Sequence, residues 1–246
     1  MRLLVVAVCL VALTASASAR PHKRQLSHEK KRIAKAAHRR FVIRGPLRGQ
    51  SVGAPWSGSL RQAAQLETGE GYHIRRPSRS YGTRATVEFV THVVNDVREQ
   101  FPDTHVLAIG DLSAQTGGAI TEHHSHQSGR DADIGLIYNA KPEGYPDSFV
   151  VATEANIDPA ATLALVLGFA ATAGADGGAQ VMFLDFDVQG ILYRWAKDHE
   201  VAEDRLGTLF QYPHRGASTG LVRHEPNHAN HLHVRFKCPK LDSACR

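Results

Sequence analysis

The chain carries two clusters of histidine and aspartate about a hundred residues apart, and no other feature of the sequence constrains the fold as strongly. The first cluster spans residues 123–133 (HHSHQSGRDAD) and the second spans residues 228–235 (HANHLHVR). Together they hold six of the 15 histidines. Imidazole and carboxylate groups are the usual ligands of a hydrolytic zinc ion, which takes three protein ligands and keeps one position open. Neither cluster alone can supply such a site, so we expect a fold that brings the two together.

The spacing within each cluster predicts strands that present their polar side chains on one face. Side chains two residues apart on a strand share a face. Asp131 is therefore expected on the same face as Asp133, and His231 on the same face as His233. His126 lies seven residues before Asp133, and the glycine between them permits a tight turn that folds the histidine back over the strand. Each pattern alone is weak evidence, because single histidines are mostly structural. Their joint occurrence suggests that His126, Asp133 and His233 bind a metal and leave room for a water whose pKa falls to about 7.

The rest of the chain predicts helices and strands that alternate at irregular spacing. We expect an α+β fold, with a small, mainly antiparallel sheet that carries the metal ligands and is flanked by helices and long ordered loops. Valines at helical spacing and the pair Asp158-Pro159, an N-cap followed by proline, mark two of the helices. Residues 45–82 are rich in Gly, Pro, Ser and Arg and predict ordered loop with little regular structure. The expected helices are 84–100, 159–172 and 189–199, and the expected strands are 106–109, 132–138, 180–186 and 231–236.

The N-terminus has the form of a secretion signal. A positive residue, an apolar run and the small-x-small site Ala17-Ser18-Ala19 follow one another, so we expect residues 1–19 to be a cleaved signal peptide. A lipoprotein signal built on Cys9 is the alternative, but Val8 stands where a small residue is expected. No later run reaches the ~18 apolar residues of a membrane span. We therefore expect an exported, periplasmic protein.

The net charge of +5 hides a strong asymmetry along the chain. Residues 20–44 hold ten Lys and Arg and one acidic residue, so they carry +9, whereas residues 45–246 carry −5. We interpret 20–44 as a basic linker or tail and 45–246 as the folded domain. Such a tail suits contact with an anionic wall polymer or membrane, and a solvated linker fits it equally well. Nucleic-acid binding is disfavoured, because the protein is expected outside the cytoplasm and its domain is acidic.

Two cysteines remain once the signal peptide is removed, Cys238 and Cys245. An even pair in an exported protein favours a disulfide, here one that closes a short C-terminal loop. Two free thiols are the alternative, and export makes them the weaker one.

Several stretches resemble one family of peptidases. Residues 125–134 (SHQSGRDADI), with residues 228–235 and the following Cys238-Pro239, closely resemble the penicillin-insensitive murein endopeptidases. That family belongs to a wider group with lysostaphin-type enzymes, D-Ala-D-Ala metallopeptidases and hedgehog domains. Residues 50–53 (QSVG) and 109–112 (IGDL) also look like segments of it.

The resemblance covers about residues 50–245 and implies a zinc metallopeptidase. The substrate that it implies is the peptide cross-link of peptidoglycan, cut between D-Ala and diaminopimelate. It implies that His228 and His231 line the site without binding the metal, and that His123 lies near the metal as a further candidate ligand. The zinc ligands that it implies are His126, Asp133 and His233.

The expected mechanism uses a water and not a side-chain nucleophile. A neutral His231 or His228 accepts the proton of the water and passes it to the leaving amine, or one of them binds the oxyanion; the sequence does not choose between them. Some family members carry a second metal site. Asp147 matches its aspartate, but Val150 stands where its histidine would be, which argues against a second metal here.

Three other functions fit parts of the sequence. A D,D- or L,D-carboxypeptidase of the same metal group would trim free stem peptides, and cleft shape separates it from an endopeptidase. A non-catalytic wall-binding module would lack a metal ligand or both of the auxiliary histidines, His228 and His231, and neither loss is seen. A nucleic-acid binder would have to use the basic tail. The sequence gives no indication of oligomeric state.

Overall fold

The computed structural model describes Lys31 and residues 49–246, and it has the expected α+β architecture. The expected signal peptide and almost all of the basic segment lie outside the described residues. Within the described part, no helix is long and apolar enough to cross a membrane.

The helices are α2 (Arg84–Gln100), α3 (Pro159–Thr172), α4 (Phe186–Asp198) and α5 (Glu203–Leu209), with a 3₁₀ turn η1 (Pro77–Arg79). The strands are β1 (Ser51–Ala54), β2 (Ser57–Leu60), β3 (Ala64–Gln65), β4 (Tyr72–Ile74), β5 (Tyr81–Gly82), β6 (Leu107–Ile109), β7 (Asp131–Gly135), β8 (Ala179–Phe183), β9 (Val222–Arg223) and β10 (His231–Phe236).

A six-stranded mixed sheet forms the centre of the molecule, with the strand order β4-β6-β7-β10-β8-β9. The inner pairings β6–β7, β7–β10 and β10–β8 are antiparallel, and the two outer pairings are parallel. The other strands form two small ladders, β1–β2 and β3–β5. The central strands β7 and β10 carry the end of the first histidine cluster and most of the second. The topology therefore places the two clusters side by side.

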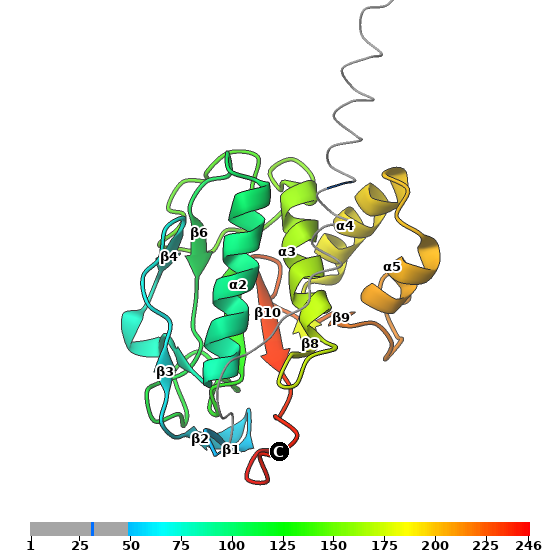
Figure 1. The fold of residues 1–246 in the computed structure, drawn as a ribbon. Coiled ribbons are helices and arrows are strands. Elements are labelled where there is room, and N and C mark those ends of the chain that lie inside the picture. Colours follow the sequence, from blue (N-terminus) through cyan, green and yellow to red (C-terminus); the bar gives the residue numbers. More distant parts are fainter. Residues whose placement is uncertain (1–30, 32–48) are drawn as a thin grey trace, which may run out of the picture.

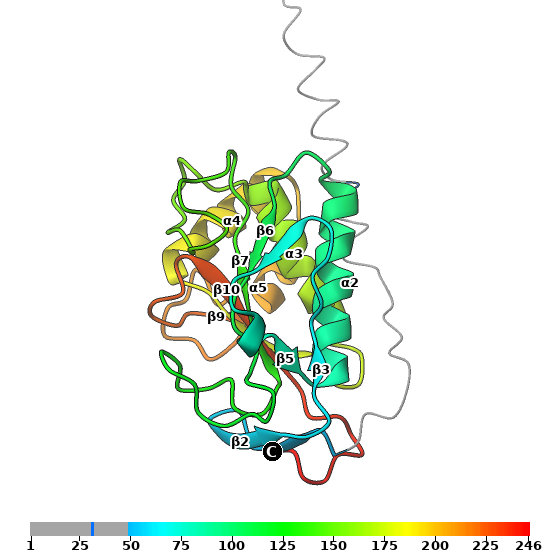
Figure 2. The ribbon, with the colours of Figure 1, turned by 90° about the vertical axis from the view of Figure 1, so that its left-hand side faces the viewer.

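One face of the sheet is apolar and packs against helices. Ile134 of β7 and Leu232 and Val234 of β10 are completely buried, and the ring of Phe236 stacks on that of Phe89 of α2 at 5.8 Å. In Figure 1, α3 lies between α2 and α4, which explains why this helix is apolar almost all round. Figure 2 shows α2 on one side of the sheet and long loops on the other. The polar face of β7 and β10 is left for a site.

Side-chain caps set the beginnings of the two long helices at the expected residues. The Thr83 hydroxyl accepts a hydrogen bond from the backbone N–H of Thr86 (3.1 Å) at the start of α2. The Asp158 carboxylate accepts one from the N–H of Ala161 (3.0 Å) at the start of α3. Each bond satisfies a backbone donor that the first helical turn leaves unpaired. The predicted bounds of both helices are confirmed.

Other boundaries differ from the prediction. Helix α4 begins at Phe186 and not at Gln189, because Asp185 caps it by accepting a hydrogen bond from the N–H of Asp187 (2.9 Å). The strand before it therefore ends earlier than expected, at Phe183. Helix α5 was not expected. The expectation of little regular structure before residue 83 was wrong in part, since β1 to β5 lie there; each is only two to four residues long, too short to establish a period.

The strand that carries Asp133 is also shorter than expected, since β7 ends at Gly135 and not at Tyr138. The Tyr145 hydroxyl packs against this point: a Cβ on Gly135 would lie 2.5 Å from it. The same hydroxyl hydrogen-bonds the Leu136 carbonyl (3.2 Å). Tertiary packing thus ends the strand, although the sequence stays apolar.

The expected disulfide between Cys238 and Cys245 is present, with the Cα atoms 5.6 Å apart. The loop that it closes lies beside the β1–β2 hairpin, as Figure 1 shows near the C-terminus. Gly53 N–H donates to the Ala244 carbonyl (2.8 Å), and Arg246 N–H donates to the Gly53 carbonyl (3.0 Å). These bonds attach the C-terminal segment to the hairpin.

Candidate metal centre

Asp133 lies among four histidines on the polar face of the sheet. His126, Asp133 and His233 are almost fully buried, at 0 to 4 % exposure of the whole residue. The Asp133 carboxylate is approached from two sequence-distant segments at once. From Oδ1, the distances are 3.1 Å to His233 Nδ1, 3.4 Å to His126 Nε2 and 3.7 Å to His231 Nε2, and from Oδ2 the distance is 3.8 Å to His123 Nε2.

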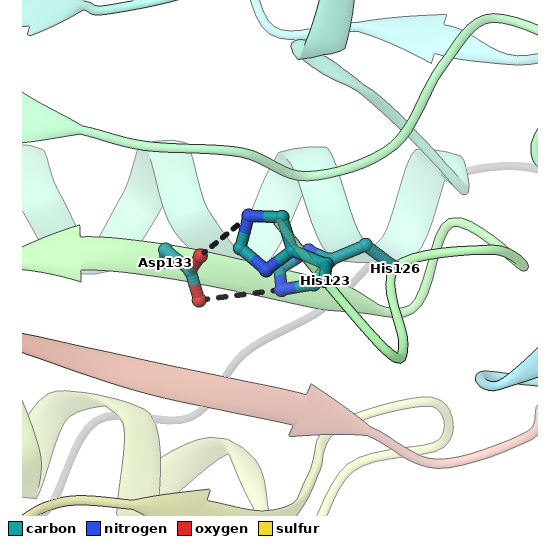
Figure 3. A group of neighbouring side chains, drawn as sticks. All are labelled: His123, His126 and Asp133. Atoms are coloured by element: carbon teal, nitrogen blue, oxygen red, sulfur yellow. Dashed lines mark ion pairs between the residues drawn. The ribbon is translucent and has the colours of Figure 1, made fainter. Parts of the chain in front are cut away.

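Strand register and a constrained loop create this arrangement. His233 pairs directly with Asp133 across the β7–β10 ladder. His126 comes from the loop before β7, as Figure 3 shows, and its φ of +65° is uncommon for a residue other than glycine. Its backbone N–H donates to Asp131 Oδ2 (2.9 Å), which holds the loop over the strand. The expected turn back over β7 is therefore seen, and Asp131 stabilises it.

The partner of His126 leaves one of its ring nitrogens free to bind a metal, whereas both ring nitrogens of His233 face carboxylates. His126 Nδ1 lies 2.8 Å from the Leu112 carbonyl oxygen, which can only accept, so Nδ1 carries the hydrogen and Nε2 keeps its lone pair. His233 Nε2 lies 3.2 Å from Asp131 Oδ1, so its Nδ1 faces Asp133. Metal-binding histidines usually donate their other N–H to a carbonyl or carboxylate in this way.

The donor set fits a divalent cation. His126 Nε2 and Asp133 Oδ1 are buried without a hydrogen-bond partner, a condition that is costly unless a ligand satisfies them. They lie 3.4 Å apart, close to the ~3.3 Å between ligand atoms of a tetrahedral zinc with bonds of about 2.0–2.1 Å. Burial lowers the pKa of His233, but hydrogen bonds and charges from Asp131 and Asp133 outweigh burial and raise it to about 9. The site therefore favours positive charge.

His123 approaches from another side and has a carboxylate partner of its own. The ligand atoms of His123, His126 and Asp133 all lie within 4.8 Å of one another (Figure 3). His123 Nε2 is nevertheless closer to Asp111 Oδ2 (3.0 Å) than to Asp133 Oδ2 (3.8 Å). Among the described residues, the three whose ligand atoms come this close are thus His123, His126 and Asp133, whereas His233, the third ligand expected from the sequence, contacts Asp133 but is not in that group.

Asp111 is a buried residue of the site that sequence reasoning missed. Its carboxylate forms ion pairs with Arg76 Nε and Arg79 Nη1, both at 2.9 Å, besides its contact with His123. Burial raises the pKa of Asp111, but hydrogen bonds from His123 and Arg79 and the charge of Arg76 outweigh burial and lower it. The only sequence signal was its place in the family-like stretch 109–112. Asp111 positions His123 beside the cluster.

The auxiliary histidines both present an unprotonated Nε2. His231 Nδ1 lies 2.6 Å from the side-chain oxygen of Asn230, and His228 Nδ1 lies 2.8 Å from the Pro226 carbonyl oxygen. These oxygens accept hydrogen bonds, so each Nδ1 carries the hydrogen. Burial lowers the pKa of His228 and lowers that of His231 to about 4. Both rings are therefore neutral at neutral pH and able to accept a proton.

A cavity of about 490 Å³ opens beside the cluster. Trp56, at the turn between β1 and β2, lines this cavity and is 61 % exposed. The volume is in the usual range of ligand pockets. Its lining includes Trp56, His123, Phe183, His228, His231, His233 and Arg235.

The possible second metal ligand, Asp147, has another partner. Its Oδ1 lies 3.1 Å from His73 Nε2, and its side chain is 82 % exposed. Among the described residues, the group whose ligand atoms lie close enough together to hold a metal is that of His123, His126 and Asp133, and Asp147 is not in it.

Residues 51–158 match the family described as penicillin-insensitive murein endopeptidase. The family resemblance is confirmed over this stretch. No curated protein matches the chain. The matched stretch includes His123, His126 and Asp133, and β10 with His231 and His233 lies after it. The match to this family supports the interpretation of the chain as a hydrolase that cleaves peptides and acts on peptidoglycan.

Proposed function

We propose that this chain is a zinc-dependent endopeptidase that hydrolyses D-Ala–diaminopimelate cross-links of peptidoglycan in the periplasm. The observation that carries the proposal is the buried set of His126, Asp133 and His233, held together across β7 and β10. We assign these three as the zinc ligands, because His126 and His233 approach the same oxygen of Asp133 and each has a second partner that orients it. His123 lies beside them as the alternative third ligand. When bound, zinc supplies the Lewis acidity that activates water and polarises a carbonyl.

We assign the general base to His231. Its free Nε2 lies 3.7 Å from Asp133 Oδ1, so a water next to the cluster is within its reach. The ring of Phe149 stacks on the imidazole at 4.9 Å with an interplanar angle of 11°, which holds its orientation. His231 takes the proton of the water and returns it to the leaving amine. His228, whose ring lies 4.7 Å from that of His231, lines the cavity, and its Nε2 accepts a hydrogen bond from a peptide N–H.

We extend the proposal to the remaining parts of the chain. Residues 1–19 direct export, 20–44 form a basic linker that contacts anionic wall polymer or membrane, and 45–246 form the catalytic domain. The disulfide between Cys238 and Cys245 suits an oxidising compartment.

Digestion of isolated sacculi, with and without a chelator, tests the function. The expected result is conversion of cross-linked dimers into monomers, loss of that activity with chelator and recovery with zinc, as read by mass spectrometry. An Asp133→Ala variant serves as the inactive control. Release of D-Ala from monomers, with dimers left intact, would instead show a carboxypeptidase. Binding to sacculi without any product would show a wall-binding module.

A further inference from the structure

Three arginines near the end of β4 differ in how their charges are satisfied. Arg76 forms ion pairs with Asp111 (2.9 Å) and Glu122 (2.6 Å), and Arg79 hydrogen-bonds Asp111 (2.9 Å). Arg75 has no carboxylate within ion-pair distance among the described residues. Its Nε donates to the backbone carbonyl of Asp147 (2.9 Å), and the described part of the chain offers its two terminal nitrogens no hydrogen-bond partner. Within the described part of the chain, Arg75 is thus a cation whose two terminal nitrogens donate no hydrogen bond.

The Arg75 guanidinium belongs to a stack that leads into the candidate metal centre. Its Cζ lies 4.2 Å from the centroid of the Phe149 ring, and that ring stacks on His231 at 4.9 Å. Gly110 permits this packing, because a Cβ there would lie 2.7 Å from Phe149 Cζ and 2.9 Å from Asp133 Cβ. The guanidinium is therefore one phenyl ring away from the residue assigned as the base.

The charge of Arg75 suits an anion from outside the chain. Burial and the neighbouring charge of Arg76 lower its pKa, but a guanidinium remains protonated in proteins. Its planar fork matches a carboxylate, with two parallel hydrogen bonds. A half-buried cation without a carboxylate partner gains most from such a ligand, because part of its desolvation cost is already present in the free protein.

We propose that Arg75 binds the free carboxylate of diaminopimelate on the amine side of the scissile bond. This inference rests on the proposed function. In the D-Ala–diaminopimelate cross-link, that carboxylate is attached to the carbon that bears the scissile nitrogen. It is therefore the anion of the substrate that lies nearest to the bond cleaved. Arg75 thereby selects cross-links whose diaminopimelate is a free acid over those in which it is amidated.

The test combines removal of the charge from the residue with removal of the charge from the substrate. Two dimers that differ only in a carboxylate or carboxamide at this position are cleaved by the zinc-loaded wild type, Arg75→Gln and Arg75→Lys. Arg215→Gln is the matched control, because Arg215 also stacks on a phenyl ring (Cζ 4.3 Å from the Phe186 centroid) but lies outside the site. The same proteins are titrated by calorimetry with the amine-side product, a stem peptide with carboxylate or carboxamide, which reports binding without catalysis.

Wild type and Arg215→Gln should prefer the carboxylate dimer by about 10- to 100-fold in kcat/KM, in line with a hydrogen bond to a charged group. Arg75→Gln should cleave both dimers equally, at the rate at which wild type cleaves the amidated dimer. The preference of Arg75→Lys for the carboxylate dimer should fall between those of wild type and Arg75→Gln. The inference is overturned if Arg75→Gln keeps the preference, or if it loses activity equally on both dimers. If wild type cleaves neither dimer, the endopeptidase function fails, and the product titration still decides whether Arg75 distinguishes carboxylate from carboxamide.

Discussion

His233 lies directly opposite Asp133 across the β7–β10 ladder, with Nδ1 3.1 Å from Oδ1. A one-residue change of register would turn one of the two side chains toward the apolar face, because alternate residues of a strand point to opposite sides. The pairing of the two central strands therefore determines whether the candidate metal centre exists. Ile134 and Leu232, which face the core from the same strands, maintain that register by their burial.

Removal of His233 should remove metal and activity together. His233→Ala leaves two of the three assigned ligands, which rarely hold zinc tightly. We expect elemental analysis to show less than a stoichiometric amount of zinc and dimer cleavage to be lost. His214→Ala, at an exposed position outside the site, is the control and should retain both. Full zinc content in His233→Ala would transfer the third-ligand assignment to His123.

Removal of His231 should slow the reaction and leave the zinc in place. A true acid–base group contributes about 10²- to 10⁴-fold, so we expect a loss of that size in kcat for His231→Ala. His228→Ala should mainly raise KM, because that residue is assigned to substrate binding. Steady-state kinetics on purified dimers separates the two effects. A larger kcat loss for His228→Ala than for His231→Ala would reverse the assignment.

The central strands could be predicted from the sequence, whereas much of the surrounding site could not. The alternation around Asp133 and His233 places polar and apolar residues on opposite faces, and that pattern is visible without a structure. The contact between Asp111 and His123 and the stack of Arg75 on Phe149 depend on how aperiodic loops pack. No local pattern reports such packing. The short strands before α2 were missed for a related reason, since two to four residues are too few to show a period.

Asp131 should tune the affinity for zinc without being a ligand. It contacts His233 Nε2 (3.2 Å), accepts from the N–H of His126 (2.9 Å) and pairs with Arg235 Nε (2.8 Å). Partners of this kind typically contribute 10- to 100-fold to metal affinity. We expect Asp131→Asn to raise the zinc dissociation constant by that amount in a chelator competition assay. Thermal unfolding of the zinc-saturated variant shows whether the fold is kept, and an unchanged dissociation constant would refute the role.

The disulfide should stabilise the domain without contributing to metal binding. It closes a short loop, so its expected contribution lies at the low end of the usual range, about 2 kcal/mol. Urea denaturation of the double variant Cys238→Ser/Cys245→Ser should show a loss of free energy of unfolding of that size. Wild type in reductant should behave in the same way. Zinc content should stay stoichiometric, and its loss would show that the C-terminal segment supports the metal centre.

His105 should make the free energy of unfolding depend on pH. Its Nε2 accepts a hydrogen bond from the backbone N–H of Tyr138 (3.0 Å), and its Nδ1 lies 2.9 Å from the Val106 carbonyl oxygen. Only the neutral ring satisfies both partners. Burial lowers the pKa of His105 and, together with the charges of Arg98 and Lys141, outweighs the hydrogen bond to the Val106 carbonyl, which raises it. Below pH ~6.5 the unfolded chain takes up a proton that the folded chain resists, so stability falls as the pH falls.

The measurement is the difference in free energy of unfolding between wild type and His105→Gln, from urea denaturation at several pH values between 7.5 and 5.5. At pH 7.5 wild type should be the more stable, because the ring packs edge-on against Tyr145 at 4.9 Å. The difference should shrink toward pH 5.5, since only wild type carries the titrating ring. Other titrating groups, including those of the metal centre, are common to both proteins and cancel in the difference. A difference that stays constant over this range would show that the His105 ring is protonated as readily in the folded protein as in the unfolded chain.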